Sequence, residues 1–295
     1  MRIAQKLKLI RGAAYNASRV TSTRPPRTAL PIVVAPLAAI AGFVLMQVGS
    51  AIVARPLGFR PTLLVAEALL ALPSVAALLV SGVGLRRGLG LIPLPARSLV
   101  LSVAFGAALW GLSLGLFELQ HSLWRPPAWF LEHFQAVHKL LRPQGPFDAL
   151  VSFLAIALVP AACEELVFRG AVLSALLGLG ATAAVIGSSM LFSAIHLQAS
   201  SSGELSFYQL PFTFVVGIGL ALLRLRTGSL VPAILAHATV NGITFATAPF
   251  AGALDGPLPD PRPLFGATLL LGGLLGSGLF FRLLRNSLTP QRMGL

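Results

Sequence analysis

The chain has 295 residues, of which 56% are hydrophobic and only 11% are charged. Soluble domains carry about 25% charged residues, so the composition excludes an ordinary soluble protein and predicts an all-α polytopic membrane protein. The net charge of +13 resembles that of nucleic-acid-binding proteins, but the basic residues gather at the ends of apolar runs and not on a polar face with interleaved aromatic residues. We therefore expect the membrane as a partner and no nucleic acid.

Residues 1–30 form a basic N-terminal segment with seven basic residues and no acidic residue. Ile3, Leu7, Ile10 and Ala14 fall on one helical face, so the segment could form an interfacial helix on an anionic membrane surface. An arginine-rich, acid-free N-terminus is also typical of an organellar transit peptide. The sequence leaves both interpretations open.

Eight apolar segments follow that are long enough to cross a bilayer as helices. They cover residues 31–53, 62–85, 98–119, 148–177, 181–198, 209–225, 229–248 and 264–284. Proline and glycine residues lie at several of the joints between these segments. We therefore expect about eight transmembrane helices in one bundle.

The connection between the third and fourth segments is too polar to cross a membrane. Its apolar side chains recur at helical spacing, at Phe130, Phe134, Val137 and Leu141. Trp124 and Trp129 suit a membrane–water interface. This pattern predicts a helix over residues 126–142 that lies flat on the membrane.

The basic residues also predict an orientation. If the N-terminus is inside, the inner segments hold sixteen of the 22 Lys and Arg residues and the outer segments hold six. By the positive-inside rule, this bias places both termini in the cytoplasm. The composition, rich in Ala, Leu, Gly and Arg, suggests a bacterial inner membrane.

Glu164, Glu165 and Arg169 lie inside one of the most apolar parts of the chain. An ionised group at mid-depth in a bilayer costs about 2.5–3.5 kcal/mol on insertion scales, so such a cluster is a candidate functional site. Glu165 and Arg169 are spaced i,i+4 in the favourable order and are expected to pair. This pairing leaves Glu164 as the free carboxylate.

Three further polar residues follow in later apolar segments: His196, His237 and Asn241. His237 and Asn241 are four residues apart and share one helical face. If Gly178–Gly180 is the turn of a helical hairpin, Glu164 and His196 both lie about 22–24 Å from it and face each other. A carboxylate and a histidine can activate water, and a second histidine with an amide can stabilise an oxyanion. The set predicts attack of water on a peptide carbonyl.

Other polar residues in the apolar segments have simpler interpretations. Cys163, the only cysteine, is interpreted as a small residue that packs between helices. Glu67 and Glu118 are interpreted as interfacial acids near the ends of their segments. Phe192, one turn before His196, is interpreted as a packing residue.

Three motifs in order resemble the CAAX protease and bacteriocin-processing family. They are Glu-Glu-x-x-x-Arg at 164–169, Phe-x-x-x-His at 192–196 and His-x-x-x-Asn at 237–241. Eukaryotic members of this family cut prenylated CAAX proteins in the endoplasmic reticulum membrane. The resemblance covers about 148–248, which is the expected catalytic core.

The remainder of the chain resembles the family only as membrane spans and connections. Residues 31–147 would hold the N-terminal transmembrane helices with the interfacial helix, and residues 249–295 the last transmembrane helix with a basic tail. The resemblance implies an intramembrane endopeptidase whose active site lies in the helix bundle and whose substrate is a peptide or protein, possibly lipidated. It implies water activation by Glu164 and His196, an oxyanion site of His237 and Asn241, and support from Glu165 and Arg169.

Other functions remain open from the sequence. Glu164, His196 and His237 could form a two-histidine, one-carboxylate Zn²⁺ site, and the family has often been called metalloproteases. There is no His-Glu-x-x-His helix, however, and the resemblance favours water activated by a glutamate without a cofactor. A transporter or channel could use the same side chains to relay protons or bind ions, and a non-proteolytic immunity protein could keep the fold.

Overall fold

The computed structural model describes residues 29–247 and 260–287. Within these residues the chain is helical apart from its connections and one small antiparallel hairpin, formed by β1 (Gln198–Ala199) and β2 (Leu205–Ser206). The prediction of an all-α membrane protein is confirmed. The basic segment 1–30 lies almost entirely outside the described residues, as does most of the predicted basic tail.

Seven helical stretches in the described part of the chain are long and apolar enough to cross a membrane. They are α2 (Val34–Leu57), α3 (Phe59–Val80), α5 (Ala96–Leu123), the continuous stretch Pro146–Leu179, α11 (Leu210–Thr227), α12 (Leu230–Thr247) and α13 (Pro263–Ser287). The eighth expected segment is α10 (Ala181–Ala194), an apolar helix of 14 residues. It is about 21 Å long and is shorter than expected because the chain leaves the helix for a turn that contains His196.

The stretch Pro146–Leu179 contains two π-helical turns between its α-helical parts and ends in a 3₁₀ turn. Its parts are α7 (Pro146–Phe153), the π-helix η1 (Leu154–Leu158), α8 (Val159–Glu165), the π-helix η2 (Leu166–Val172), α9 (Leu173–Leu176) and the 3₁₀ turn η3 (Leu177–Leu179). A π-helical turn adds a residue to the helical repeat and redirects the side chains that follow, and such turns are frequent at functional sites. Here they bracket the two glutamates.

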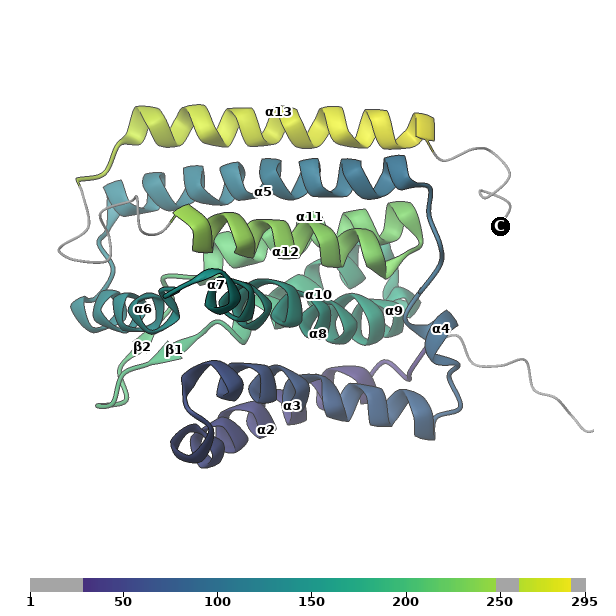
Figure 1. Cartoon of the computed structure of the whole chain (residues 1–295). Coiled ribbons are helices and arrows are strands. Elements are labelled where there is room, and N and C mark those ends of the chain that lie inside the picture. The colour runs from purple at the N-terminus through teal and green to yellow at the C-terminus, as the bar shows by residue number, and fades with distance from the viewer. Residues whose placement is uncertain (1–28, 248–259, 288–295) are drawn as a thin grey trace, which may run out of the picture.

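The long helices form layers that run back and forth between two ends of the bundle (Figure 1). The α13 helix packs on α5, and α5 packs on α12, whereas α2 packs on α3 at the opposite face of the molecule. The stretch Pro146–Leu179 lies between these outer pairs and contacts α3 on one side and α12 on the other. The helix of the expected catalytic core is therefore enclosed by other helices.

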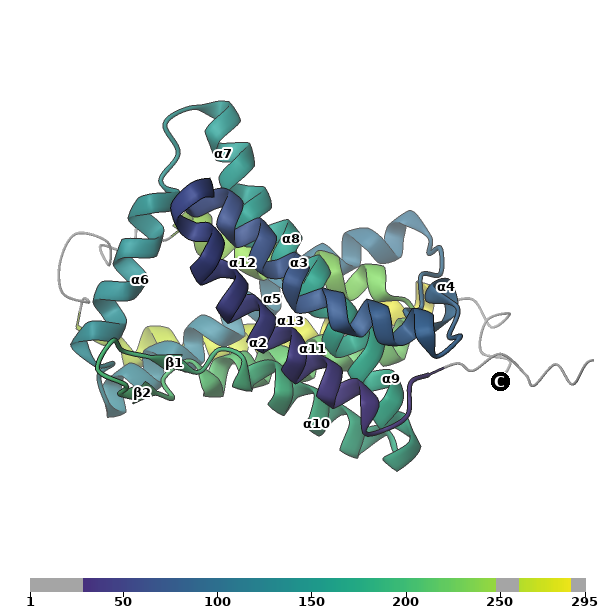
Figure 2. The same ribbon diagram turned by 90° about the horizontal axis from the view of Figure 1, so that it is seen from below.

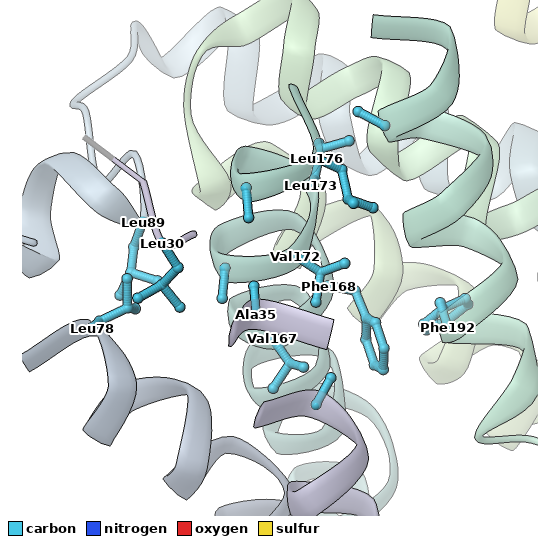
Figure 3. Packing of buried hydrophobic residues seen from close by; sticks show 14 of the residues in the cluster. Leu30, Ala35, Leu78, Leu89, Val167, Phe168, Val172, Leu173, Leu176 and Phe192 are labelled. Carbon is cyan, nitrogen blue, oxygen red and sulfur yellow. The ribbon is translucent and has the colours of Figure 1, made fainter. Parts of the chain in front are cut away.

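Two hydrophobic clusters hold these layers together. The first surrounds η2 and includes side chains from α2, α3 and α10, and Figure 3 shows Val167, Phe168 and Phe192 within it. The second joins α5, α11, α12 and α13 around Phe105 and Leu220. The polar side chains of the expected site lie where the elements of both clusters meet.

The connection predicted at 126–142 is helix α6 (Ala128–Leu141), which begins directly after Pro127. Proline is favoured at a helix start because its missing N–H has no partner to lose there. Phe130 and Leu141 are buried against the bundle, and Figure 2 shows α6 and α7 together at one end of the molecule. The orientation of α6 flat on a membrane stays a prediction.

Candidate active site

Glu165 and Arg169 form a fully buried ion pair on the central helix. The Arg169 Nη1 donates to Glu165 Oε1 over 2.9 Å, and neither side chain has any exposed area. The Arg169 Nη2 donates to the carbonyl oxygen of Gly217 in α11 over 3.0 Å. The expected i,i+4 pair is present, and it also ties the central helix to α11.

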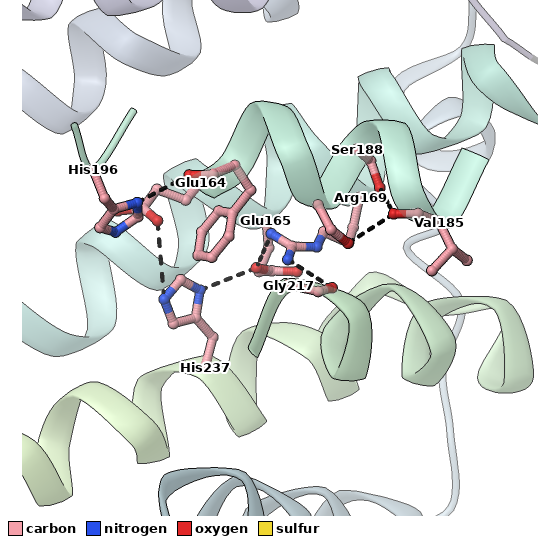
Figure 4. Close-up of polar contacts among 10 residues, drawn as sticks. Glu164, Glu165, Arg169, Val185, Ser188, His196, Gly217 and His237 are labelled. Atoms are coloured by element: carbon pink, nitrogen blue, oxygen red, sulfur yellow. Dashed lines mark hydrogen bonds and ion pairs between the residues drawn. The ribbon is translucent and has the colours of Figure 1, made fainter. Parts of the chain in front are cut away.

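His237 in α12 shares the same carboxylate oxygen. Its Nδ1 lies 3.0 Å from Glu165 Oε1, and its Nε2 lies 3.9 Å from Glu164 Oε2. Because Glu165 is paired with a cation, its carboxylate is the acceptor and the His237 Nδ1–H is the donor. The Nε2 atom of His237 is therefore directed toward Glu164 (Figure 4).

Glu164 differs from Glu165 in its hydrogen bonding. It is nearly buried, with 7% of its surface exposed, and its Oε2 accepts no hydrogen bond from the described residues. The 3.9 Å separation from His237 Nε2 exceeds a hydrogen bond. Two polar atoms at this separation can both bind one water molecule or one substrate group.

His196 lies in the turn after α10, at the end of the cluster where Figure 4 shows Glu164. Its Nδ1 lies 2.9 Å from the carbonyl oxygen of Phe192. A carbonyl oxygen only accepts, so Nδ1 carries the proton and Nε2 of the neutral ring has a free lone pair. The geometry presents His196 as a base or an acceptor through Nε2.

Phe192 contacts every ring and cation of the cluster. The guanidinium of Arg169 lies 4.2 Å from the centre of its ring, and the rings of His196 and His237 lie 5.0 and 5.5 Å away. The interpretation of Phe192 as a packing residue fits its buried position, but the residues that it packs are those of the site. An aromatic face beside a guanidinium adds a cation–π attraction in this buried place.

Gly217 is a site residue that the sequence did not indicate. A Cβ atom at this position would lie 3.0 Å from the Cβ of Ser189 and 3.2 Å from the Phe192 ring. A side chain here would have to displace Ser189 or Phe192 by a few tenths of an ångström, so glycine favours the close approach of α11 to α10 that brings its carbonyl to Arg169. A single glycine within an apolar helix carries no local signal for this role.

Asn241 and His196 form no hydrogen bond or ion pair with the other four predicted residues within the described part of the chain. Asn241 lies one helical turn beyond His237 on α12 and is half-buried, without a hydrogen bond to any residue that the structure describes. Glu165 contacts both Arg169 and His237 through its carboxylate, and Glu164 lies 3.9 Å from His237 Nε2. The structure therefore brings four of the six predicted residues into polar contact, with His196 packed beside them on Phe192.

The Zn²⁺ alternative requires Glu164, His196 and His237 to surround one ion. Among residues 29–247 and 260–287, no group of three or more His, Cys, Asp or Glu side chains is placed so that it could hold a metal ion. The Nδ1 atoms of both histidines are bound by other acceptors, so Nε2 is the nitrogen that each ring could offer to a ligand. The Zn²⁺ alternative stays a prediction.

Glu118 and Glu67, the two acids outside the motifs that were interpreted as interfacial, differ in their positions along their helices. Glu118 pairs with Arg262 through the backbone N–H at 3.0 Å and the side chain at 3.4 Å, near the end of α5. Glu67, which we also expected at an interface, lies eight residues beyond Phe59, the first residue of α3. That is about 12 Å along the helix axis, so Glu67 lies within α3 and beyond its first turn, and its interfacial position stays a prediction.

Comparison with known proteins finds a family match for the central part of the chain. The family model described as type II CAAX prenyl endopeptidase Rce1-like matches residues 146–243, which are 98 of the 295 residues. No curated protein and no solved structure matches the chain. The matched segment begins with α7 and ends just after Asn241, so it contains all six predicted site residues.

Proposed function

Because the chain belongs to the CAAX protease and bacteriocin-processing family, we propose that it is an intramembrane endopeptidase that cleaves peptide bonds with water activated by Glu164 and His196. The observation that carries this proposal is the contrast between the two adjacent glutamates. Glu165 is neutralised by Arg169 and bound by His237, whereas Glu164 Oε2 has no partner among the described residues and faces His237 at 3.9 Å. A buried carboxylate free to accept a proton suits a general base.

The proposed reaction begins with one water molecule between Glu164 and His196. Glu164 accepts a proton from this water while the water oxygen attacks the carbonyl carbon of the substrate peptide. The carbonyl oxygen becomes an oxyanion, which His237 and Asn241 stabilise by donating hydrogen bonds. The C–N bond then breaks, and the leaving nitrogen takes the proton held by Glu164.

Glu165 and Arg169 support His237 in this scheme. The Nδ1–H of His237 donates to Glu165, so a neutral His237 has no proton on Nε2. It can donate to an oxyanion from Nε2 only as an imidazolium. Arg169 in turn fixes the Glu165 carboxylate from the other side.

The substrate in this proposal is a peptide segment that reaches the site from the membrane. Residues around the cluster are apolar, and the family cleaves proteins within membranes, so a lipidated tail is one candidate substrate. We propose the bacterial inner membrane as the location and the cytoplasm as the side of both termini, on the distribution of Lys and Arg. No cofactor takes part in the proposed chemistry.

The test uses the purified full chain in detergent micelles with two internally quenched peptides, one with a prenylated C-terminal cysteine and one without. Wild type and Glu164→Gln are compared with and without a zinc chelator, and Glu118→Gln serves as a control at a buried carboxylate outside the site. We expect chelator-resistant cleavage that falls by about 100-fold or more in Glu164→Gln, the scale of a general base, and persists in Glu118→Gln.

The other outcomes separate the alternatives. Cleavage abolished by the chelator and restored by Zn²⁺ would support a metalloprotease built on the same residues. Full cleavage by Glu164→Gln would contradict the proposed base. Proton flux in liposomes without any cleavage would favour a transporter, and a biological effect retained in Glu164→Gln would favour a non-proteolytic immunity protein.

A further inference from the structure

Arg224 is a half-buried arginine that belongs to none of the motifs of the proposed peptidase. It lies in the last turn of α11, at the end of the bundle where α4 (Leu85–Gly88) also lies (Figure 1). Its Nε atom is buried and has no hydrogen-bond partner among the described residues. A buried donor without an acceptor costs free energy, so Arg224 is suited to an acceptor from outside the chain.

The guanidinium of Arg224 packs directly on the backbone of Gly90, in the connection between α4 and α5. A Cβ atom at Gly90 would lie 2.6 Å from the Arg224 Cζ and 2.9 Å from the carbonyl oxygen of Gly228. Gly90 also has a φ of +64°, a conformation that glycine adopts without strain. Both the space and the backbone conformation therefore favour glycine beside this arginine.

Two hydrogen bonds hold this connection against the turn between α11 and α12. The Leu230 N–H donates to the Gly90 oxygen over 2.9 Å. The hydroxyl of Ser229 donates to the Ile92 oxygen over 2.8 Å. Arg224, the connection 89–92 and the turn 227–229 thus form one fixed arrangement, which we call the Arg224 junction.

The segments that form the Arg224 junction carry positive charge and no carboxylate. The sequence has no Asp or Glu at residues 68–117 or 205–254. Arg86, Arg97 and Arg226 are exposed at the same end of the bundle. Several cations without a nearby acid in the same segments create a positive potential, which attracts an anion.

Exposed apolar side chains lie beside these charges. Leu91 and Ile92 in the connection and Leu222, two residues before Arg224, each expose between 40% and 44% of their surface. A small soluble anion would leave these side chains uncovered. The acyl chains of a lipid would cover them, so the combination of cations and apolar side chains favours a lipid over a free anion.

We propose that the Arg224 junction binds the phosphate group of an anionic phospholipid, whose acyl chains lie against Leu91, Ile92 and Leu222. A guanidinium offers planar, charged donors that match a phosphate group. Arg224 lies three residues before the last residue of α11, which is about 4.5 Å along the helix axis, at a depth that suits a lipid head group. Basic sites between membrane helices on the cytoplasmic side bind lipid head groups in this way.

The test is native mass spectrometry of the purified full chain in a neutral detergent, titrated with phosphatidylglycerol or with phosphatidylcholine. Wild type, Arg224→Gln and Arg224→Lys are compared, and Arg226→Gln is the matched control on the same helix. We expect wild type to bind one phosphatidylglycerol about tenfold more tightly than phosphatidylcholine, the scale of one hydrogen bond to a charged group. Arg224→Gln should lose this preference, and Arg226→Gln should keep it.

Three results would overturn the proposal. Equal binding of the two lipids by wild type would show that the phosphate of an anionic lipid is not selected. Equal losses in Arg224→Gln and Arg226→Gln would show a diffuse attraction by many arginines. Displacement of phosphatidylglycerol by millimolar inorganic phosphate would show a site for the free anion.

Arg224→Lys keeps the test decisive if Arg224→Gln does not fold. Lysine keeps the positive charge but lacks the planar donors of the guanidinium. We expect a severalfold loss of affinity for phosphatidylglycerol in this variant, and unchanged affinity would contradict the contact between the guanidinium and the phosphate. None of these measurements depends on peptide cleavage, so the lipid site stands or falls separately from the proposed function.

Discussion

A single carboxylate oxygen, Glu165 Oε1, contacts both Arg169 and His237. It accepts from Arg169 at 2.9 Å and lies 3.0 Å from His237 Nδ1. A buried ion pair is weak evidence for stability, because the desolvation of both charges offsets their attraction. Its value here is positional, since it fixes which nitrogen of His237 faces Glu164.

The planar guanidinium of Arg169 donates from two nitrogens to two different acceptors, which a lysine cannot reproduce. Lysine at 169 keeps the charge but cannot hold Glu165 and the Gly217 carbonyl with a planar fork while stacking on Phe192. We expect Arg169→Lys to lower the free energy of unfolding by about 1.5–3 kcal/mol, the scale of one hydrogen bond to a charged group, and to reduce peptide cleavage on the order of tenfold.

The measurement is denaturant unfolding in mixed micelles together with the cleavage assay. Arg226→Lys is the matched control, because Arg226 is exposed at the end of α11. Equal unfolding free energies for the two variants would show that the second bond of Arg169 contributes nothing.

At the scale of elements, small residues decide how closely the helices approach. Without a hydrophobic force between apolar helices in lipid, packing at small residues holds membrane helices together. The contact between α5 and α13 follows this rule: a Cβ atom at Gly273 would lie 2.6 Å from the Leu112 nitrogen and 2.8 Å from the Ala108 oxygen. The adjacent Gly272 has no such neighbour within 4 Å.

This pair of glycines provides a matched test on one helix. We expect Gly273→Ala to lower the free energy of unfolding by about 1–3 kcal/mol, because the added methyl forces α13 away from α5. Gly272→Ala should be neutral or slightly stabilising, since alanine favours a helix over glycine. The measurement is thermal or denaturant unfolding in micelles, and equal effects of the two substitutions would disprove the close contact.

The π-helical turns η1 and η2 are the other feature at this scale. They flank α8, which ends with Glu164 and Glu165. The one-residue change in winding after Glu165 alters which side chains face α12 and which face α3. Within α8 itself, Glu165 lies 3.0 Å from His237 Nδ1 and Glu164 lies 3.9 Å from Nε2 of the same ring.

At the scale of the whole molecule, the helices alternate in direction. The α2 helix begins and α13 ends at the same end of the bundle, and the β1–β2 hairpin lies at the opposite end (Figure 1). With the short helix α10 included, the chain crosses the bundle an even number of times, so the first and last helices have their outer ends on the same side. This arrangement agrees with termini on one side of the membrane, and the charge bias favours the cytoplasmic side.

The orientation can be tested with single cysteines in a Cys163→Ala background. Ser201 in the β1–β2 connection and Arg226 at the end of α11 are both exposed and lie at opposite ends of the bundle. We expect a membrane-impermeant maleimide to label Ser201→Cys in intact bacterial cells and Arg226→Cys only after lysis. The reverse pattern would overturn the predicted orientation.

The sequence by itself determined the features that depend on composition and short spacing. Apolar runs of about twenty residues predict spans because a bilayer has a fixed thickness, and seven of the eight predicted segments are helices long enough to cross. The pairing of Glu165 with Arg169 was predictable because residues four apart on a helix are neighbours in any fold. Both are local properties.

Only the tertiary structure decided how distant helices meet. His237 lies 72 residues after Glu165 in the chain, and no spacing rule connects the two. Gly217 looks like any small residue of an apolar helix until the approach of α10 to α11 is known. Packing between helices is set by the shapes of many side chains at once, so the surroundings of each glutamate, and with them its chemistry, follow from the assembled bundle.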